Sequence, residues 1–136
     1  MKKVMLALVL LVCALAAHAE PASNEDAQDA VLAFLSLVDQ RQYDKSYLAA
    51  SAVLRKEVSQ QDWVAHISNL RAPLGPLVER TFSASEPQES LPEAPPGEYI
   101  IFTFDSSFEN NKYITEVVAV AKGSDGVWRI IGYYFD

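Results

Sequence analysis

The hydrophobic period of this chain changes once, and that change limits the folds it can adopt. Between residues 24 and 72, apolar residues recur at the three- and four-residue spacing of amphipathic helices. Between residues 77 and 135, β-branched and aromatic residues follow the two-residue period of strands. Helices followed by strands predict an α+β domain, in which the helices pack on one face of a curved, mostly antiparallel four-stranded sheet.

Three helices are expected, at residues 24–42, 43–52 and 59–72. Ser23 with Asp26 resembles a capping box, and Ser59 with Asp62 repeats the same start signal. The apolar stripe of the first helix consists of Ala27, Ala30, Val31, Phe34, Leu35 and Val38. Pro73 and Gly75 are expected to end the third helix.

Four strands are expected, at residues 77–83, 98–108, 113–122 and 127–135. The turn residues at 109–111 and 124–126 predict hairpins between the last three. Residues 83–97 contain four prolines and three glutamates, so regular structure is not expected there. We interpret this stretch as a long surface connection within one domain.

The first 19 residues have the pattern of a secretory signal peptide. Lys2 and Lys3 precede an apolar stretch at residues 4–17, and Ala17-His18-Ala19 is a small-x-small cleavage site. We expect cleavage after Ala19, a single domain at residues 20–136, and a periplasmic or secreted location. Cys13 raises the alternative of a lipoprotein, but Val12 before it is a poor residue for lipid attachment.

Loss of the leader changes the composition of the expected mature chain. Its formal net charge falls from −7 to −9 because both leader lysines are removed. It keeps no cysteine and only one histidine, so disulfides, thiolate chemistry and histidine-rich metal sites are excluded. We expect no cofactor and no membrane span. The acidic balance argues against nucleic acid or anionic lipid as a partner.

Two charged residues interrupt apolar strand faces. Glu116 shares its face with Ile114, Val118 and Val120, and Arg80 lies between Val78 and Phe82 at period two. Burial of either charge alone would be costly, so an ion pair inside the domain is expected. The pair has two interpretations, a structural bridge or a polar anchor for a ligand.

Two further residues are considered for acid–base catalysis. His66 has Asp62 at i−4, but it lies at the edge of the apolar stripe of its helix, which favours a solvated histidine. Asp105 follows Tyr99, Ile101 and Thr103 at period two, near a strand end. No complete catalytic constellation is evident, so no catalytic residue is assigned.

Aromatic residues could line a pocket or simply fill the core. The candidate ligand-binding residues are Tyr47, Trp63, Arg80, Tyr99, Glu116 and Tyr133. In the last strand, alternation would place Trp128, Ile130, Gly132 and Tyr134 on one face and Arg129, Ile131, Tyr133 and Phe135 on the other. Both faces are apolar, so a homodimer through the open sheet face is a second hypothesis.

Several segments resemble the nuclear-transport-factor-2-like (NTF2-like) superfamily, which has a cone-shaped, cystatin-like fold. They are Asp39-x-x-x-Tyr43-Asp44-x-Ser46-Tyr47, Ser59-x-x-Asp62-Trp63, and residues 125–134. More narrowly, the chain is similar to an uncharacterised family of exported bacterial domains of unknown function. That likeness is carried by Arg71-x-Pro73-Leu74-Gly75, Ser90-Leu91-Pro92, Pro96-Gly97-Glu98-Tyr99 and Gly132-Tyr133-Tyr134. The resemblance implies a cavity between sheet and helices, used in some relatives for isomerase or dehydratase chemistry and in others for binding.

Three functions follow as hypotheses. The first is an exported, non-catalytic module that binds a small molecule or a protein in or near the cone. The second is an isomerase- or dehydratase-type enzyme with a cavity carboxylate. The third is an envelope structural or assembly protein that dimerises through its sheet.

Overall fold

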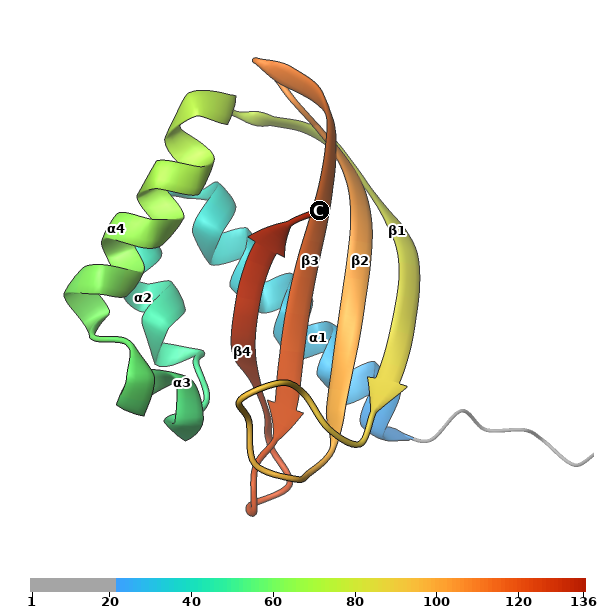
Figure 1. The fold of residues 1–136 in the computed structure, drawn as a ribbon. Helices are drawn as coiled ribbons and strands as arrows, with labels where there is room; N and C mark the ends of the chain where they lie inside the picture. The colour runs from blue at the N-terminus through green and yellow to red at the C-terminus, as the bar shows by residue number, and fades with distance from the viewer. Residues whose placement is uncertain (1–21) are drawn as a thin grey trace, which may run out of the picture.

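A computed structural model describes residues 22–136 and confirms the α+β class (Figure 1). The predicted leader lies outside the described residues. The elements are α1 (Ala22–Asp39), α2 (Tyr43–Leu48), α3 (Ala52–Glu57), α4 (Gln60–Arg71), the 3₁₀ turn η1 (Ala72–Leu74), β1 (Leu77–Gln88), β2 (Tyr99–Phe108), β3 (Asn111–Lys122) and β4 (Trp128–Phe135). The four strands form one antiparallel sheet in the order β1-β2-β3-β4. No helix within residues 22–136 is long and apolar enough to cross a membrane.

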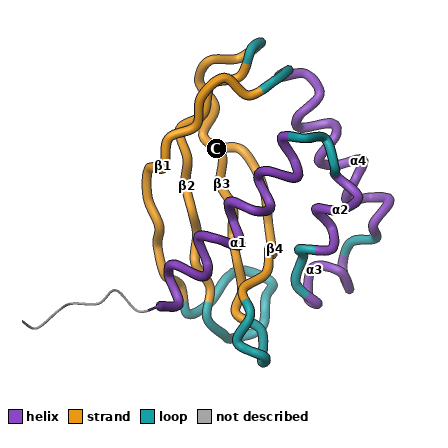
Figure 2. The backbone as a smooth tube through the Cα atoms, turned by 180° about the vertical axis from the view of Figure 1, so that it is seen from behind, coloured by secondary structure: helices purple, strands orange, loops and turns teal. Residues whose placement is uncertain are grey.

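Helix α1 crosses one face of the sheet, which we call the inner face (Figures 1 and 2). The predicted α1 stripe is buried against this face, apart from Ala30, which is half-buried. The sheet contributes Ile100, Phe102, Phe104, Val118, Val120 and Ile130 to the same core. Aromatic and branched side chains therefore fill the space between helix and sheet.

The opposite, outer face of the sheet has two different halves. Figure 1 shows the connection between β1 and β2 crossing in front of the lower part of the sheet. Leu91 and Ala94 of this connection lie near Ile101 and Ala119, which belong to the outer face. The half of the face near the β2–β3 turn remains open.

Helix α1 ends earlier than predicted, at Asp39 rather than at residue 42. The amide of Arg41 donates to the carbonyl of Val38, and the amide of Gln42 donates to that of Leu37. This pair of bonds is a Schellman motif, with Arg41 in the left-handed conformation at φ 59°. The start also differs from the prediction, because the helix already includes Ala22 and Ser23.

The predicted second helix begins at Tyr43 as expected but ends at Leu48 rather than at residue 52, and an additional short helix, α3, follows it. The helix ends before Ala50, which forms a parallel bridge with Ile130 of β4: the amide of Ser51 donates to the carbonyl of Ile130, and the amide of Ile130 donates to that of Ala49. Ser51 then caps α3 by accepting a hydrogen bond from the amide of Leu54 at 3.1 Å. Pairing with the sheet edge is a tertiary interaction that helix periodicity does not report.

The predicted cap of α4 is confirmed, since the Ser59 hydroxyl accepts from the amide of Asp62 at 3.1 Å. The first strand is longer than predicted and continues to Gln88, into the stretch expected to lack regular structure. Pro87 is tolerated there because β1 is an edge strand, where one side of the backbone needs no partner.

The predicted faces of β4 are wrong beyond Ile130. The register with β3 shifts between Ala119 and Val120, so Ile131 is an extra residue in a β-bulge. The bulge returns Tyr133 and Phe135 to the inner face with Ile130, and it places Tyr134 outside. The twofold alternation assumed from sequence cannot detect this shift.

One buried hydrogen bond joins α2 to α4 and offers a test of their packing. The indole nitrogen of Trp63 donates to the hydroxyl of Ser46 at 3.0 Å, and both residues are buried. Ser46→Ala should lower the free energy of unfolding by about 1–3 kcal/mol, because the indole N–H loses its partner. Urea unfolding measures the change. Ser36→Ala, at an exposed serine of α1, is the control and should have almost no effect.

Candidate functional site

The predicted pair of Arg80 and Glu116 is present on the inner face of the sheet. Glu116 is 0% exposed, and its two oxygens accept hydrogen bonds from Arg80 Nε at 2.7 Å and Arg80 Nη2 at 3.2 Å. Ser106 Oγ donates at 2.5 Å, and the Tyr133 hydroxyl also donates. The four bonds use all the acceptor positions of a carboxylate, so Glu116 is sealed and fully satisfied.

A second carboxylate joins this pair from the end of α1. Asp39 accepts from Arg80 Nη1 at 2.7 Å and from Arg80 Nη2 at 2.9 Å. Its Oδ1 also accepts from Nη2 of Arg71 at 2.8 Å. We call Asp39, Arg71, Arg80 and Glu116 the charge quartet. Its two guanidinium groups balance its two carboxylates, which is the condition for keeping such charges buried.

Local structure brings the quartet together from four elements. Asp39 is the last residue of α1 and Arg71 the last of α4, while Arg80 and Glu116 lie on β1 and β3. Val78 and Phe82, expected to be buried beside Arg80, are exposed on the edge strand. The shift of register near Leu77 and the edge position of β1 explain this difference.

The sequence interpretation named Arg80 and Glu116 but assigned no site role to Asp39, Arg71 or Ser106. Asp39 lies four residues after Leu35, and Arg71 lies four residues after Ile67. Both charges therefore continue the buried stripe of their helix into its last turn. A charge at the end of an apolar stripe is the signal that could have identified them.

The charges and burial at the quartet shift the pKa values of Asp39, Arg80 and the neighbouring Tyr133. Burial alone would raise the pKa of Asp39, but hydrogen bonds and charge from Arg80 and Arg71 outweigh burial and hold that pKa below its usual range. Burial would lower the pKa of Arg80, and the two carboxylates reverse this and raise it. Burial and the charge of Glu116 raise the pKa of the Tyr133 phenol. Arg80 therefore stays charged and Tyr133 stays a neutral donor.

Arg71 is the member of the quartet with spare hydrogen-bonding capacity. It is 5% exposed, and its Nε and Nη1 have no hydrogen-bond partner within residues 22–136. Its guanidinium carbon lies 4.6 Å from the centroid of the Phe108 ring, a cation–π contact that compensates in part. Buried donors without partners are rare and costly in proteins.

Arg71 also forms part of the wall of a hollow between α1, α4 and η1. The hollow has a volume of about 320 Å³ and lies where both helices end. We call it the mouth hollow; its lining includes Val38, Asp39, Arg41, Tyr43, Ser68 and Arg71. Two members of the charge quartet line it, Asp39 and Arg71, and Asp39 is the more exposed of the two.

The other predicted site residues are not brought together. The Tyr47 hydroxyl donates to the carbonyl of Val58 at 2.7 Å and holds the end of α3. Trp63 is buried in the core against Phe34. Tyr99 is buried on the other side of the sheet, where its hydroxyl donates to the carbonyl of Pro95 in the connection. Only Arg80, Glu116 and Tyr133 form a cluster.

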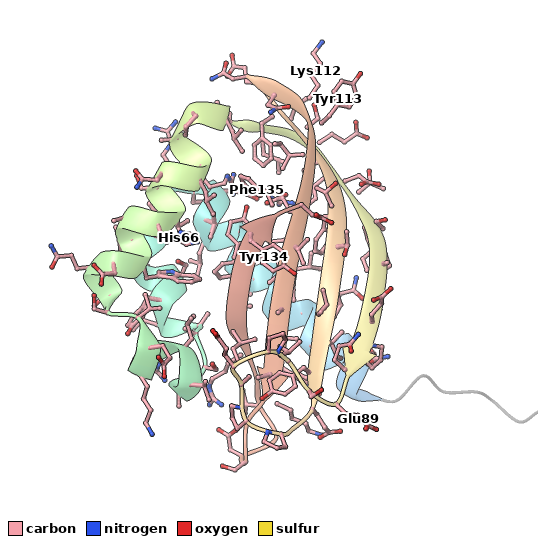
Figure 3. The ribbon with its side chains drawn as sticks, in the orientation of Figure 1. His66, Glu89, Lys112, Tyr113, Tyr134 and Phe135 are labelled. Atoms are coloured by element: carbon pink, nitrogen blue, oxygen red, sulfur yellow. The ribbon has the colours of Figure 1, made fainter. Side chains whose placement is uncertain are left out.

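The two residues considered for catalysis lie outside the interior between the helices and the sheet. His66 is exposed on α4 (Figure 3), as expected for a solvated histidine. Asp105 is exposed on the outer face, so the hypothesis that it acts as a cavity carboxylate is wrong. Residues 22–136 contain no group of three His, Cys, Asp or Glu side chains arranged to hold a metal ion.

The protein is an α+β domain. Side chains fill its interior, and the two positive and two negative charges of the charge quartet balance. The family model described as "Protein of unknown function (DUF4019)" matches residues 30–133. The chain therefore belongs to this family, as the narrower resemblance in the sequence suggested. No curated protein matches it.

Replacing the sealed carboxylate tests whether the quartet holds the fold together. Glu116→Gln should lower the free energy of unfolding by about 3–5 kcal/mol, because it leaves Arg80 buried with incomplete charge compensation. Urea unfolding at pH 7 measures the change, with Glu86→Gln on the exposed side of β1 as the control. A loss below about 0.5 kcal/mol would mean that solvent reaches Glu116.

The lowered pKa of Asp39 predicts acid sensitivity. Because its folded-state pKa is below the unfolded value of about 3.9, its ionised form stabilises the fold above about pH 5. That contribution is lost as the pH falls through the folded-state pKa. The stability difference between the natural protein and Asp39→Asn should therefore shrink between pH 6 and pH 3 in urea unfolding. An equal difference at both pH values would contradict the ion pairing.

Proposed function

We propose that this protein is an exported, non-catalytic binding module with an NTF2-like cone, which holds a small oxygen-bearing molecule in the mouth hollow. The observation that carries the proposal is Arg71, which lines that hollow and whose buried Nε and Nη1 have no hydrogen-bond partner within residues 22–136. An unsatisfied buried donor is destabilising unless it serves a ligand or another polar partner.

The lining of the mouth hollow supports a ligand with hydrogen-bond acceptors. Arg41 supplies guanidinium donors and Ser68 adds a hydroxyl, while the Arg71 guanidinium adds positive charge to the wall. Arg80 already binds Asp39 with two nitrogens, so the Asp39 charge is largely compensated. Val38 and Tyr43 provide apolar surface for the body of the molecule. A volume of about 320 Å³ is at the small end of the range for ligand pockets.

Glu116 is a poor candidate for the catalytic carboxylate of the enzyme hypothesis. A general base needs a free lone pair within reach of a substrate proton. Glu116 has none, because Arg80, Ser106 and Tyr133 occupy both oxygens. A binding role for the domain needs no such group.

The assembly hypothesis requires an apolar open sheet face. The connection after β1 crosses the lower half of the outer face and leaves a hollow there, lined in part by Leu91, Ile101 and Tyr134. The upper half carries Glu79, Thr81, Asp105 and Thr115, which favour contact with water. We therefore place binding ahead of dimerisation.

Native mass spectrometry of protein recovered from its exporting host tests the proposal. The expected spectrum shows a chain beginning at Glu20 with a small-molecule adduct that disappears on refolding. Arg41→Gln should weaken the adduct without unfolding the domain, because Arg41 is exposed.

Arg55→Gln is the matched control, since Arg55 is an exposed arginine of α3 outside the mouth hollow. An adduct retained equally in both variants would place the ligand elsewhere. A bare monomer mass in the natural protein would remove the binding proposal, and a bare dimer mass would support sheet-mediated assembly. A lipid mass on Cys13 would replace cleavage after Ala19 with lipoprotein processing.

A further inference from the structure

The open half of the outer face contains a second hollow, separate from the mouth hollow. Its volume is about 440 Å³, and it lies below the β2–β3 turn. We call its outward-facing residues the polar platform: Glu79, Thr81, Asp105, Ser107, Tyr113 and Thr115. Hydroxyl and carboxylate groups dominate this set, with one aromatic ring.

Strand register arranges the platform in rows. Thr81 on β1, Asp105 on β2 and Thr115 on β3 are direct partners across the sheet. Side chains at such positions point to the same face, with neighbouring Cβ atoms about 5 Å apart. Glu79 and Ser107 pair in the next row toward the turn. The result is a regular array of hydrogen-bonding side chains on a rigid sheet rather than on a loop.

Tyr113 adds an unpacked aromatic ring at the edge of this array. It is 91% exposed, and Figure 3 shows it with Lys112 at the tip of the β2–β3 hairpin, directed away from the body of the domain. Exposed tyrosines are common in recognition surfaces, because the ring presents a large apolar face and the hydroxyl remains polar.

We propose that the polar platform binds a neutral saccharide. A sugar ring has an apolar C–H face that fits the Tyr113 ring, and hydroxyls that both donate to carboxylates and exchange hydrogen bonds with Thr81, Ser107 and Thr115. Glu79 and Asp105 outnumber Lys112 in this hollow, so phosphorylated sugars and uronic acids are repelled. The proposal does not depend on the mouth hollow.

Amide NMR titration of the natural domain with cellopentaose, maltopentaose and chitopentaose tests the platform. At least one neutral oligosaccharide should give saturable shifts in β1, β2 and β3 near Asp105, with a Kd of about 0.1–1 mM. Oligogalacturonate should bind at least about tenfold more weakly because of charge repulsion.

Variants of two exposed tyrosines on the outer face test whether binding depends on stacking against the Tyr113 ring. Tyr113→Ala should weaken binding at least about tenfold, and Tyr113→Phe should keep most of it, because the ring supplies the stacking surface. Tyr134→Ala is the matched control, since Tyr134 is also exposed on the outer face but lies outside the platform.

Three results would overturn the proposal. They are no saturable shifts with any neutral oligosaccharide, equal binding of oligogalacturonate, or shifts confined to the mouth hollow. Unchanged affinity in Tyr113→Ala would also overturn it, because the platform would then lack its stacking residue. The amide spectrum of each variant reports its folding directly.

Discussion

Burial of the Glu116 carboxylate constrains the arrangement of much of the domain. A lone carboxylate with no exposure would be strongly destabilising, so the fold must supply a cation and enough donors. Arg80 supplies the cation from the edge strand, and Asp39 and Arg71 extend the compensation to the ends of α1 and α4. One buried charge therefore links both sides of the sheet–helix interface.

The members of the charge quartet and their partners differ in how close they lie to solvent. Glu116 and Tyr133 lie inside a core filled by side chains such as Phe34, so they are components of the fold. Arg71 lies at the boundary, where one of its nitrogens binds Asp39 and the other two have no hydrogen-bond partner within residues 22–136. Binding in this domain is therefore proposed in the mouth hollow and on the open sheet face, rather than in the filled core.

Much of the fold could be predicted because its signals are local. The α1 stripe, the Ser59 cap and the β3–β4 hairpin all follow from residues close together in the sequence. The pair of Arg80 and Glu116 was also predictable, since each interrupts an apolar pattern. Wrong predictions occurred where distant segments decide the local geometry. The β-bulge at Ile131 and the break at Ala50 both depend on neighbouring strands and helices.

The sequence by itself determined the class of the domain, the inner-facing stripe of α1 and the need for a buried ion pair, because period and charge pattern are local properties. Only the tertiary structure decided that Asp39 and Arg71 complete the pair, since they are 32 residues apart along the chain and meet where two helices end. Tertiary structure also placed Tyr99 and Asp105 on the outer face, away from the charge quartet. A sheet has two faces, and packing decides which of them the helices cover.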